Sequence, residues 1–203
     1  KSKNVGCAET GDLGKGPSAR RAAGIGVGRV YLQHILRLRE LAARHGRRIQ
    51  IWGDILLHHP ELVPELPDDV LLLDWHYEAA DDYPSVRVFA ESGRAYWVCP
   101  GTSAWNTLWP RIENSNANIR ALARLAAENG GQGLLNTDWG DNGHYEPIGQ
   151  SWYGYLYGAE QAWTGGRTAD EVFDRNLAHL FFGPRGESIV RAIRDLGRLN
   201  TLE

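Results

Sequence analysis

The sequence predicts an α/β fold, and within that class a partial (β/α)8 TIM barrel. Two observations carry the prediction. Short apolar runs alternate with helical patterns along the chain, and right-handed crossovers make such strands parallel neighbours. Each run also ends in polar or aromatic residues, as the strands of barrel enzymes do, whereas an open doubly wound sheet gathers its ligand groups at one switch point.

Five strand-like runs are predicted: the run that leads into Glu9, and residues 48–54, 69–75, 95–101 and 133–139. Helical periodicity predicts helices over residues 30–46, 83–92, 112–129, 151–163, 170–182 and 187–199. Residues 10–28 are rich in glycine and small side chains and read as a flexible loop. Thr168 and Glu171 have the spacing of a capping box at the start of the helix over residues 170–182.

We expect residues 1–203 to form a single domain, the C-terminal part of a barrel whose N-terminal strands are absent from this chain. A complete barrel takes about 250 residues, and five units would leave two strand edges unpaired. We therefore expect closure by missing sequence, by another chain or by a self-pairing dimer. The chain begins with Lys1 and contains no methionine, which suggests a fragment or a processed chain.

Charge and composition narrow the possible partners. The formal net charge is -3, which argues against a nucleic-acid partner, and no apolar run is long enough for a membrane span. No signal peptide is visible, and Cys7 and Cys99 are expected to be free thiols, so a soluble, cytoplasmic location is slightly favoured. His58-His59 with Asp54 could suggest a metal, but no third ligand has a fixed spacing and adjacent histidines on a loop usually point apart. Residues 24–28 lack the nucleotide-loop pattern, so no metal or cofactor is expected.

Glu9 is the candidate chemical centre, at the mouth of a strand–helix loop. A carboxylic acid in a partly desolvated site can act as an acid–base catalyst; the alternative is a helix-capping or ion-paired glutamate. Aromatic residues at the other strand ends could stack on a sugar ring while polar neighbours take its hydroxyls. These are Trp52 with Asp54, Trp75 with His76, Trp105 with Asn106, and Trp139 with Asp141, whereas Trp97, Trp152 and Trp163 are assigned to the core.

The stretch Asn4-Val5-Gly6-Cys7-Ala8-Glu9-Thr10, followed by Leu13-Gly14-x-Gly16-x-Ser18, resembles the strand-4 signature of family 20 glycoside hydrolases, the β-N-acetylhexosaminidases. The extension is similar to the hexosaminidase D branch. The resemblance continues through Trp52-Gly53-Asp54 at strand 5, Trp75 and Tyr77 at strand 6, residues 100–106 at strand 7, and Trp139 and Asp141 at strand 8. It implies that the chain holds strands 4–8 of a barrel, plus C-terminal helices.

The resemblance also implies an activity: hydrolysis of terminal β-linked N-acetylhexosamine, GlcNAc or GalNAc, by a substrate-assisted retaining mechanism. Glu9 then takes the general acid/base role, and the aromatic and polar strand-end residues bind the substrate. The family's acetamide-orienting aspartate is replaced here by Ala8. Alanine can neither accept a hydrogen bond nor balance charge, so the resemblance implies an impaired or inactive enzyme.

Two other functions stay open on the sequence. One is a non-catalytic carbohydrate-binding or assembly half-barrel that keeps the aromatic wall without the chemistry. The other is an unrelated α/β hydrolase, although no Gly-x-Ser-x-Gly elbow is present.

Overall fold

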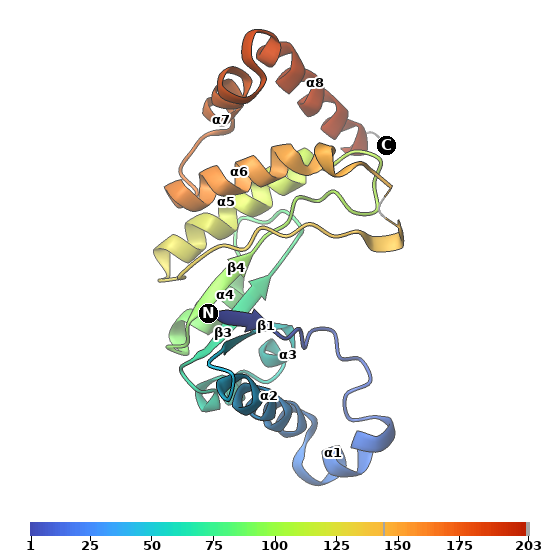
Figure 1. Cartoon of the computed structure of the whole chain (residues 1–203), viewed down its shortest axis with the longest axis vertical. Helices are drawn as coiled ribbons and strands as arrows, with labels where there is room; N and C mark the ends of the chain where they lie inside the picture. The colour runs from blue at the N-terminus through green and yellow to red at the C-terminus, as the bar shows by residue number, and fades with distance from the viewer. Residues whose placement is uncertain (144, 202–203) are drawn as a thin grey trace. The chain divides into compact units, whose positions relative to one another are not determined.

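The computed structural model describes residues 1–143 and 145–201, and it is an α/β protein (Figure 1). The chain divides into two compact units. The first holds residues 1–75, 84–98 and 129–132; the second holds residues 76–83, 99–128 and the described residues from 133 onward. That the two units belong to one barrel domain stays a prediction.

The first unit is built on a parallel four-stranded sheet in the order β1-β2-β3-β4. The strands are β1 (Ser2–Asn4), β2 (Arg48–Trp52), β3 (Val70–Trp75) and β4 (Tyr96–Cys99). Asn4 is level with Gln50, and Ile49 with Val70. β3 is almost wholly buried, as its continuous apolar run requires of a strand covered on both faces.

Helices accompany the strands of the first unit. They are α1 (Ala19–Ile25), α2 (Val27–Ala43), α3 (Asp54–Leu57) and α4 (Pro84–Glu91), with 3-10 turns η1 (Gly16–Ser18) and η2 (Pro60–Glu65). α2 buries the stripe of Tyr31, Leu32 and Ile35, spaced for one face of a helix. The core of the unit consists of these residues together with Ile49, Ile51, Val70, Leu72, Val86 and Phe89.

The second unit is mainly helical. It contains α5 (Ile112–Glu128), α6 (Trp152–Thr164), α7 (Asp170–Leu177), a π-helical turn η5 (Ala178–Phe182) and α8 (Gly186–Arg198), with 3-10 turns η3 (Asp141–Gly143), η4 (Ile148–Ser151), η6 (Gly183–Arg185) and η7 (Leu199–Thr201). α5 and α6 lie side by side (Figure 1). The hydrophobic core of the second unit includes Ile112, Ile119, Tyr153, Tyr157 and Phe173.

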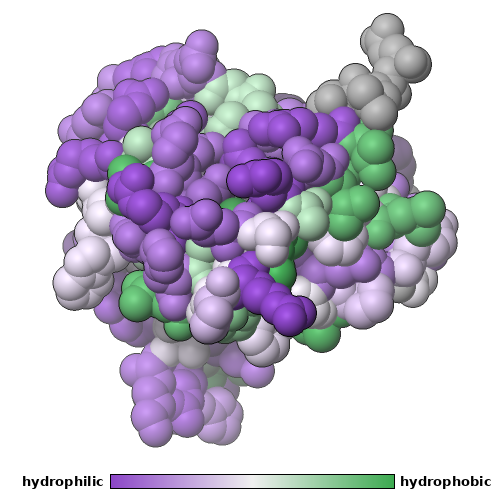
Figure 2. All heavy atoms as spheres, turned by 90° about the horizontal axis from the view of Figure 1, so that it is seen from above, coloured by the Kyte–Doolittle hydropathy of each residue, from purple (hydrophilic) through white to green (hydrophobic). Residues whose placement is uncertain are grey.

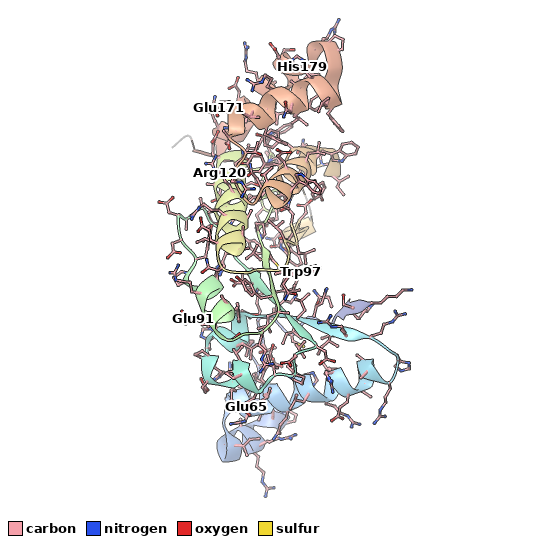
Figure 3. All side chains as sticks on the ribbon, turned by 90° about the vertical axis from the view of Figure 1, so that its left-hand side faces the viewer. Glu65, Glu91, Trp97, Arg120, Glu171 and His179 are labelled. Carbon is pink, nitrogen blue, oxygen red and sulfur yellow. The ribbon has the colours of Figure 1, made fainter. Side chains whose placement is uncertain are left out.

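A polar network joins the helices of the second unit. Arg194 of α8 binds Glu113 of α5 at 3.0 Å and Asp170 of α7 at 3.3 Å. Asp170 also pairs with Arg120 at 2.8 Å; Figure 3 labels Arg120 on α5 and Glu171 at the start of α7. Despite its burial, the pKa of Asp170 is lowered by its hydrogen bonds and by the two arginines. The network compensates for burying these charges.

The predictions for several local structures were wrong. The first strand ends at Asn4 and does not reach Glu9, because Gly6, Cys7 and Glu9 have positive φ. Residues 133–139 do not form the predicted strand. Thr137 makes only an isolated parallel bridge to Gly101. The predicted loop over residues 10–28 contains α1.

The predicted capping box does not form. Ala169 is the N-cap of α7, and the Thr168 hydroxyl instead donates to Glu160 at 2.7 Å. The core assignment was also wrong for Trp163, which is 90% exposed, and for Trp152, which is 49% exposed. Both lie on α6, whose sequence is apolar on several sides, so helical spacing did not indicate which face is covered.

The face in Figure 2 is largely hydrophilic, with separate apolar patches. In residues 1–143 and 145–201, no helix combines the length and the apolar character needed to cross a lipid bilayer. Both cysteines are free, as predicted: Cys7 is half-buried and Cys99 is buried.

Candidate active site

The segment after β1 carries the candidate acid–base residue. φ is 75° at Gly6, 73° at Cys7 and 51° at Glu9. The Glu9 side chain is exposed, not partly desolvated as the sequence predicted for an acid–base residue, and Ala8 beside it is half-buried. Non-glycine residues avoid positive φ for steric reasons, so neighbouring groups must hold this conformation.

Side chains from three elements bind the backbone of this segment. The Gly6 N–H donates to Asn4 Oδ1 at 2.7 Å, the Tyr31 hydroxyl donates to the Cys7 carbonyl at 3.0 Å, and the Glu9 N–H donates to Asp54 Oδ2 at 2.8 Å. In addition, the Trp52 N–H donates to the Gly6 carbonyl at 3.1 Å. The segment is therefore fixed to β1, β2, α2 and α3.

Asp54 is the first residue of α3, separated from the end of β2 only by Gly53. Its second oxygen, Oδ1, is buried and has no hydrogen-bond partner within residues 1–143 and 145–201. Burial raises the pKa of the Cys7 thiol, and the negative charge of Asp54 raises it further. Burial, with Cys7 and Asp54, likewise raises the pKa of Tyr31. The carboxylate thus lies among the groups that hold the Glu9 segment.

Trp52 and Trp75 are the last residues of β2 and β3. Because the strands are parallel, both residues lie at the same edge of the sheet as the segment after β1. Both are half-buried. Within the first unit, the structure therefore brings Glu9, Ala8, Trp52, Asp54 and Trp75 to one edge, as the sequence predicted for the carboxyl ends of barrel strands.

A second group of predicted residues comes together within the second unit. The Tyr77 ring lies 5.0 Å from the Trp105 ring at 70°, and 6.4 Å from the Trp139 ring at 63°. Edge contacts of this kind are favourable for aromatic pairs. A Cβ on Gly101 would lie 2.6 Å from Trp105, so the glycine is needed for the ring to approach.

Polar residues accompany this aromatic group. Asn106, at a φ of 58°, accepts a hydrogen bond from Asn142 at 2.7 Å. Asn142 belongs to η3, whose first residue is Asp141. Asn106 and Asp141 are both exposed. The structure therefore links the segment of Asn106 to the segment of Asp141, two predicted substrate contacts.

Two acidic residues in the same unit, half-buried Asp138 and buried Glu146, were not anticipated as a pair. Asp138 accepts hydrogen bonds from Thr102 at 2.7 Å and from Tyr155. Glu146 is 3% exposed and accepts a hydrogen bond from Ser151 at 3.5 Å. Burial, then the charge of Asp138, raises the pKa of Glu146 to about 7. Burial, then the contact with Asp138, raises the pKa of Tyr155 to about 12.

The candidate residues thus form two groups, one in each unit. Glu9, Ala8, Trp52, Asp54 and Trp75 make up the acid group; Tyr77, Trp105, Asn106, Trp139 and Asp141 make up the aromatic group. Sequence reasoning missed Glu146. Glu146 stands before Pro147, and nothing in the sequence pattern there signals its burial.

No group of three or more histidine, cysteine or acidic side chains suited to a metal ion occurs in the described part of the chain. No protein-family model matches this chain, and no curated protein matches it significantly. The functional argument therefore rests on the two groups of residues.

Proposed function

We propose that this chain is the C-terminal part of a glycosidase barrel that hydrolyses terminal β-linked N-acetylhexosamine by a substrate-assisted, retaining mechanism. The observation that carries the proposal is the placement of Glu9. It is an exposed carboxyl group on a segment held in a rare backbone conformation, at the edge of a parallel sheet where two strands end in tryptophan.

In the first step the acetamido oxygen of the substrate attacks C1 of the same sugar. The C1–O bond to the leaving group breaks, and the Glu9 carboxyl gives its proton to the leaving oxygen. The product is an oxazolinium-type intermediate. Its positive charge needs a negative partner close to the acetamide nitrogen.

In the second step the Glu9 carboxylate takes a proton from water, and the water oxygen bonds to C1. The bond between C1 and the acetamido oxygen breaks, which restores the acetamide and gives net retention. Ala8 cannot supply the negative partner that both steps use. Loss of such a partner costs roughly 10²–10³-fold in rate, so we expect slow turnover with binding largely preserved.

The aromatic residues have a separate role in this proposal. The faces of Trp52, Trp75 and the group of Tyr77, Trp105 and Trp139 suit the apolar side of a sugar ring. Asn106 and Asp141 are exposed polar groups suited to sugar hydroxyls. The expected ligand is therefore an N-acetylated amino-sugar glycoside.

Completion of the barrel forms part of the proposal. β1 pairs with β2 along one side and all three of its residues are exposed, which leaves it at the edge of the sheet. An unpaired edge is a template for another strand. We propose that strands outside this chain, or a second copy of it, pair there.

Inhibitor binding tests the proposal. A thiazoline mimics the oxazolinium intermediate, so the whole protein should bind it far more tightly than it binds N-acetylglucosamine. Glu9→Gln keeps the shape but removes the acid, and should abolish residual hydrolysis of a chromogenic N-acetylhexosaminide. Equal affinity for the two ligands, with no turnover in any variant, would contradict an enzymatic role.

Ala8 itself favours a second function, that of a carbohydrate-binding half-barrel without catalysis. It removes a chemical group and leaves the aromatic residues in place. This alternative predicts that N-acetylglucosamine and the thiazoline bind alike, and that Glu9→Gln has little effect on either affinity.

A further inference from the structure

We propose that Asp54 is the positioning residue of the acid–base glutamate: its carboxylate holds the Glu9 backbone in the left-handed region and so aims the Glu9 side chain. This inference rests on the proposed function for its catalytic consequence. Its structural part stands on hydrogen bonds and burial alone.

Glu9 has a backbone conformation that is unusual for a glutamate. A φ of 51° at a glutamate is disfavoured, and it persists only where the surroundings over-determine it. The Cβ of a residue in this conformation points in a different direction from that of the same residue in a strand or a right-handed turn. The direction of the Glu9 carboxyl therefore depends on what fixes its φ.

Asp54 is the group that fixes the φ of Glu9. The Glu9 N–H donates to Asp54 Oδ2 at 2.8 Å, and the Glu9 carbonyl accepts from the Gly11 N–H at 2.8 Å within a tight local turn. The first bond reaches across 45 residues and has a charged acceptor. Charge-assisted hydrogen bonds are about twice as strong as neutral ones. Asp54 therefore ties Glu9 to a separate element.

The backbone beside Asp54 is itself fixed. Gly53 before it donates its N–H to the Leu73 carbonyl of β3 at 2.9 Å. A Cβ at Gly53 would lie 2.6 Å from the Phe89 ring, so the chain packs closely against the core at this point. The carboxylate therefore projects from a rigid site, as preorganisation of a catalytic group requires.

The two carboxylate oxygens of Asp54 indicate a positioning role and not substrate binding. Oδ2 is occupied by the Glu9 N–H, and Oδ1 is buried. Buried Oδ1 is withdrawn from solvent, and Oδ2 has at most one lone pair left for a sugar hydroxyl. This differs from the sequence-based expectation that Asp54 contacts substrate. Asp54 should thus affect how fast bound substrate reacts more than how tightly it binds.

The structural part is tested by nuclear magnetic resonance on the 203-residue chain. Asp54→Ala should change the three-bond HN–Hα coupling of Glu9, which reports φ, and speed hydrogen exchange at its amide. Asp54→Asn keeps an oxygen acceptor and should restore most of both signals. Asp69→Ala is the matched control, because that carboxylate binds Arg39 away from the segment. An unchanged Glu9 signal in folded Asp54→Ala would overturn the proposal.

The catalytic part is tested in the whole protein carrying Ala8→Asp. There Asp54→Ala should lower kcat by roughly 10–100-fold with little change in KM, since misplacement of a reacting group by about 1 Å can cost 10²-fold. A raised KM with unchanged kcat would overturn positioning and make Asp54 a sugar ligand. If no variant hydrolyses the substrate, the proposed function fails while the resonance experiment still decides the role of Asp54.

Discussion

The Glu9 N–H and the Asp54 carboxylate form a 2.8 Å hydrogen bond that joins the candidate acid to a residue 45 positions away. Tyr31 binds the same segment from α2, through the Cys7 carbonyl. The segment that carries Glu9 is therefore held by tertiary contacts from α2 and α3 in addition to its own strand. Substitutions of the supporting residues should reveal this.

We predict that Tyr31→Phe destabilises the first unit. The substitution keeps the buried ring, which is 3% exposed, but leaves the Cys7 carbonyl without its 3.0 Å donor. The free energy of unfolding should fall by about 1–3 kcal/mol, the usual range for a buried group that loses its partner. Urea denaturation followed by tryptophan fluorescence measures it. Tyr145→Phe, at a ring 60% exposed, should have almost no effect.

The free energy of unfolding should decrease as pH rises, because of Glu146. Its pKa rises from 4.5 to about 7 on folding, through burial and the charge of Asp138, so the folded state holds the proton more tightly. The resulting stabilisation is complete below about pH 4.5 and is lost as pH rises to about 7. The shift corresponds to about 3 kcal/mol.

Glu146→Gln tests this, because glutamine mimics the protonated side chain. Denaturation at pH 5 and pH 8 should show a smaller difference in unfolding free energy than in the parent chain. Glu91→Gln, at an exposed carboxylate, should keep the parent's difference. The same pH dependence in Glu146→Gln as in the parent would show that the proton is held elsewhere.

Gly101→Ala should disrupt the aromatic group. The new methyl would lie 2.6 Å from Trp105 and 3.1 Å from Tyr77, so the rings must separate. We expect a loss of about 1–3 kcal/mol, the cost of overpacking, and a changed near-ultraviolet circular dichroism spectrum. Gly149→Ala is the control, since nothing lies within 4 Å of its Cβ position. Identical spectra for Gly101→Ala and the parent would refute the close packing.

Arg194→Ala should destabilise the second unit strongly. It removes a cation that joins three helices, although Arg120 still pairs with Asp170 and Arg198 with Glu113. The loss should therefore stay below the roughly 3–5 kcal/mol of breaking a fully buried ion pair. Arg198→Ala, at a side chain 58% exposed, should cost less than about 1 kcal/mol. Limited proteolysis between α7 and α8 offers a second measurement. Similar losses in the two variants would contradict the network's role.

Much of the fold followed from the sequence where periodicity was strong. The helix predicted over residues 112–129 is α5, Ile112–Glu128, and the strand predicted over residues 69–75 is β3, Val70–Trp75. Both have long or continuous apolar patterns that tertiary contacts reinforce. The first strand was overestimated because Val5 to Glu9 has the composition of a strand, whereas side-chain hydrogen bonds impose a left-handed turn.

The candidate site was predicted in part. The alternation of strands and helices placed Trp52, Trp75 and Glu9 at one edge of a parallel sheet, as the structure has them. The meeting of Tyr77 with Trp105 and Trp139 depends on loop conformations that no period encodes. Burial of Glu146 likewise depends on a local fold that brings Ser151 and Asp138 to it, which no sequence period encodes.

The rate of N-acetylhexosaminide hydrolysis before and after Ala8→Asp tests the central claim most directly. In the whole protein, the restored carboxylate should raise kcat by roughly 10²–10³-fold, and adding Glu9→Gln should abolish the gain. Such a result would establish Glu9 as the acid–base residue and Ala8 as the lost acetamide partner. If Ala8→Asp gives no increase in rate in a folded protein, the chain does not work as a substrate-assisted hexosaminidase.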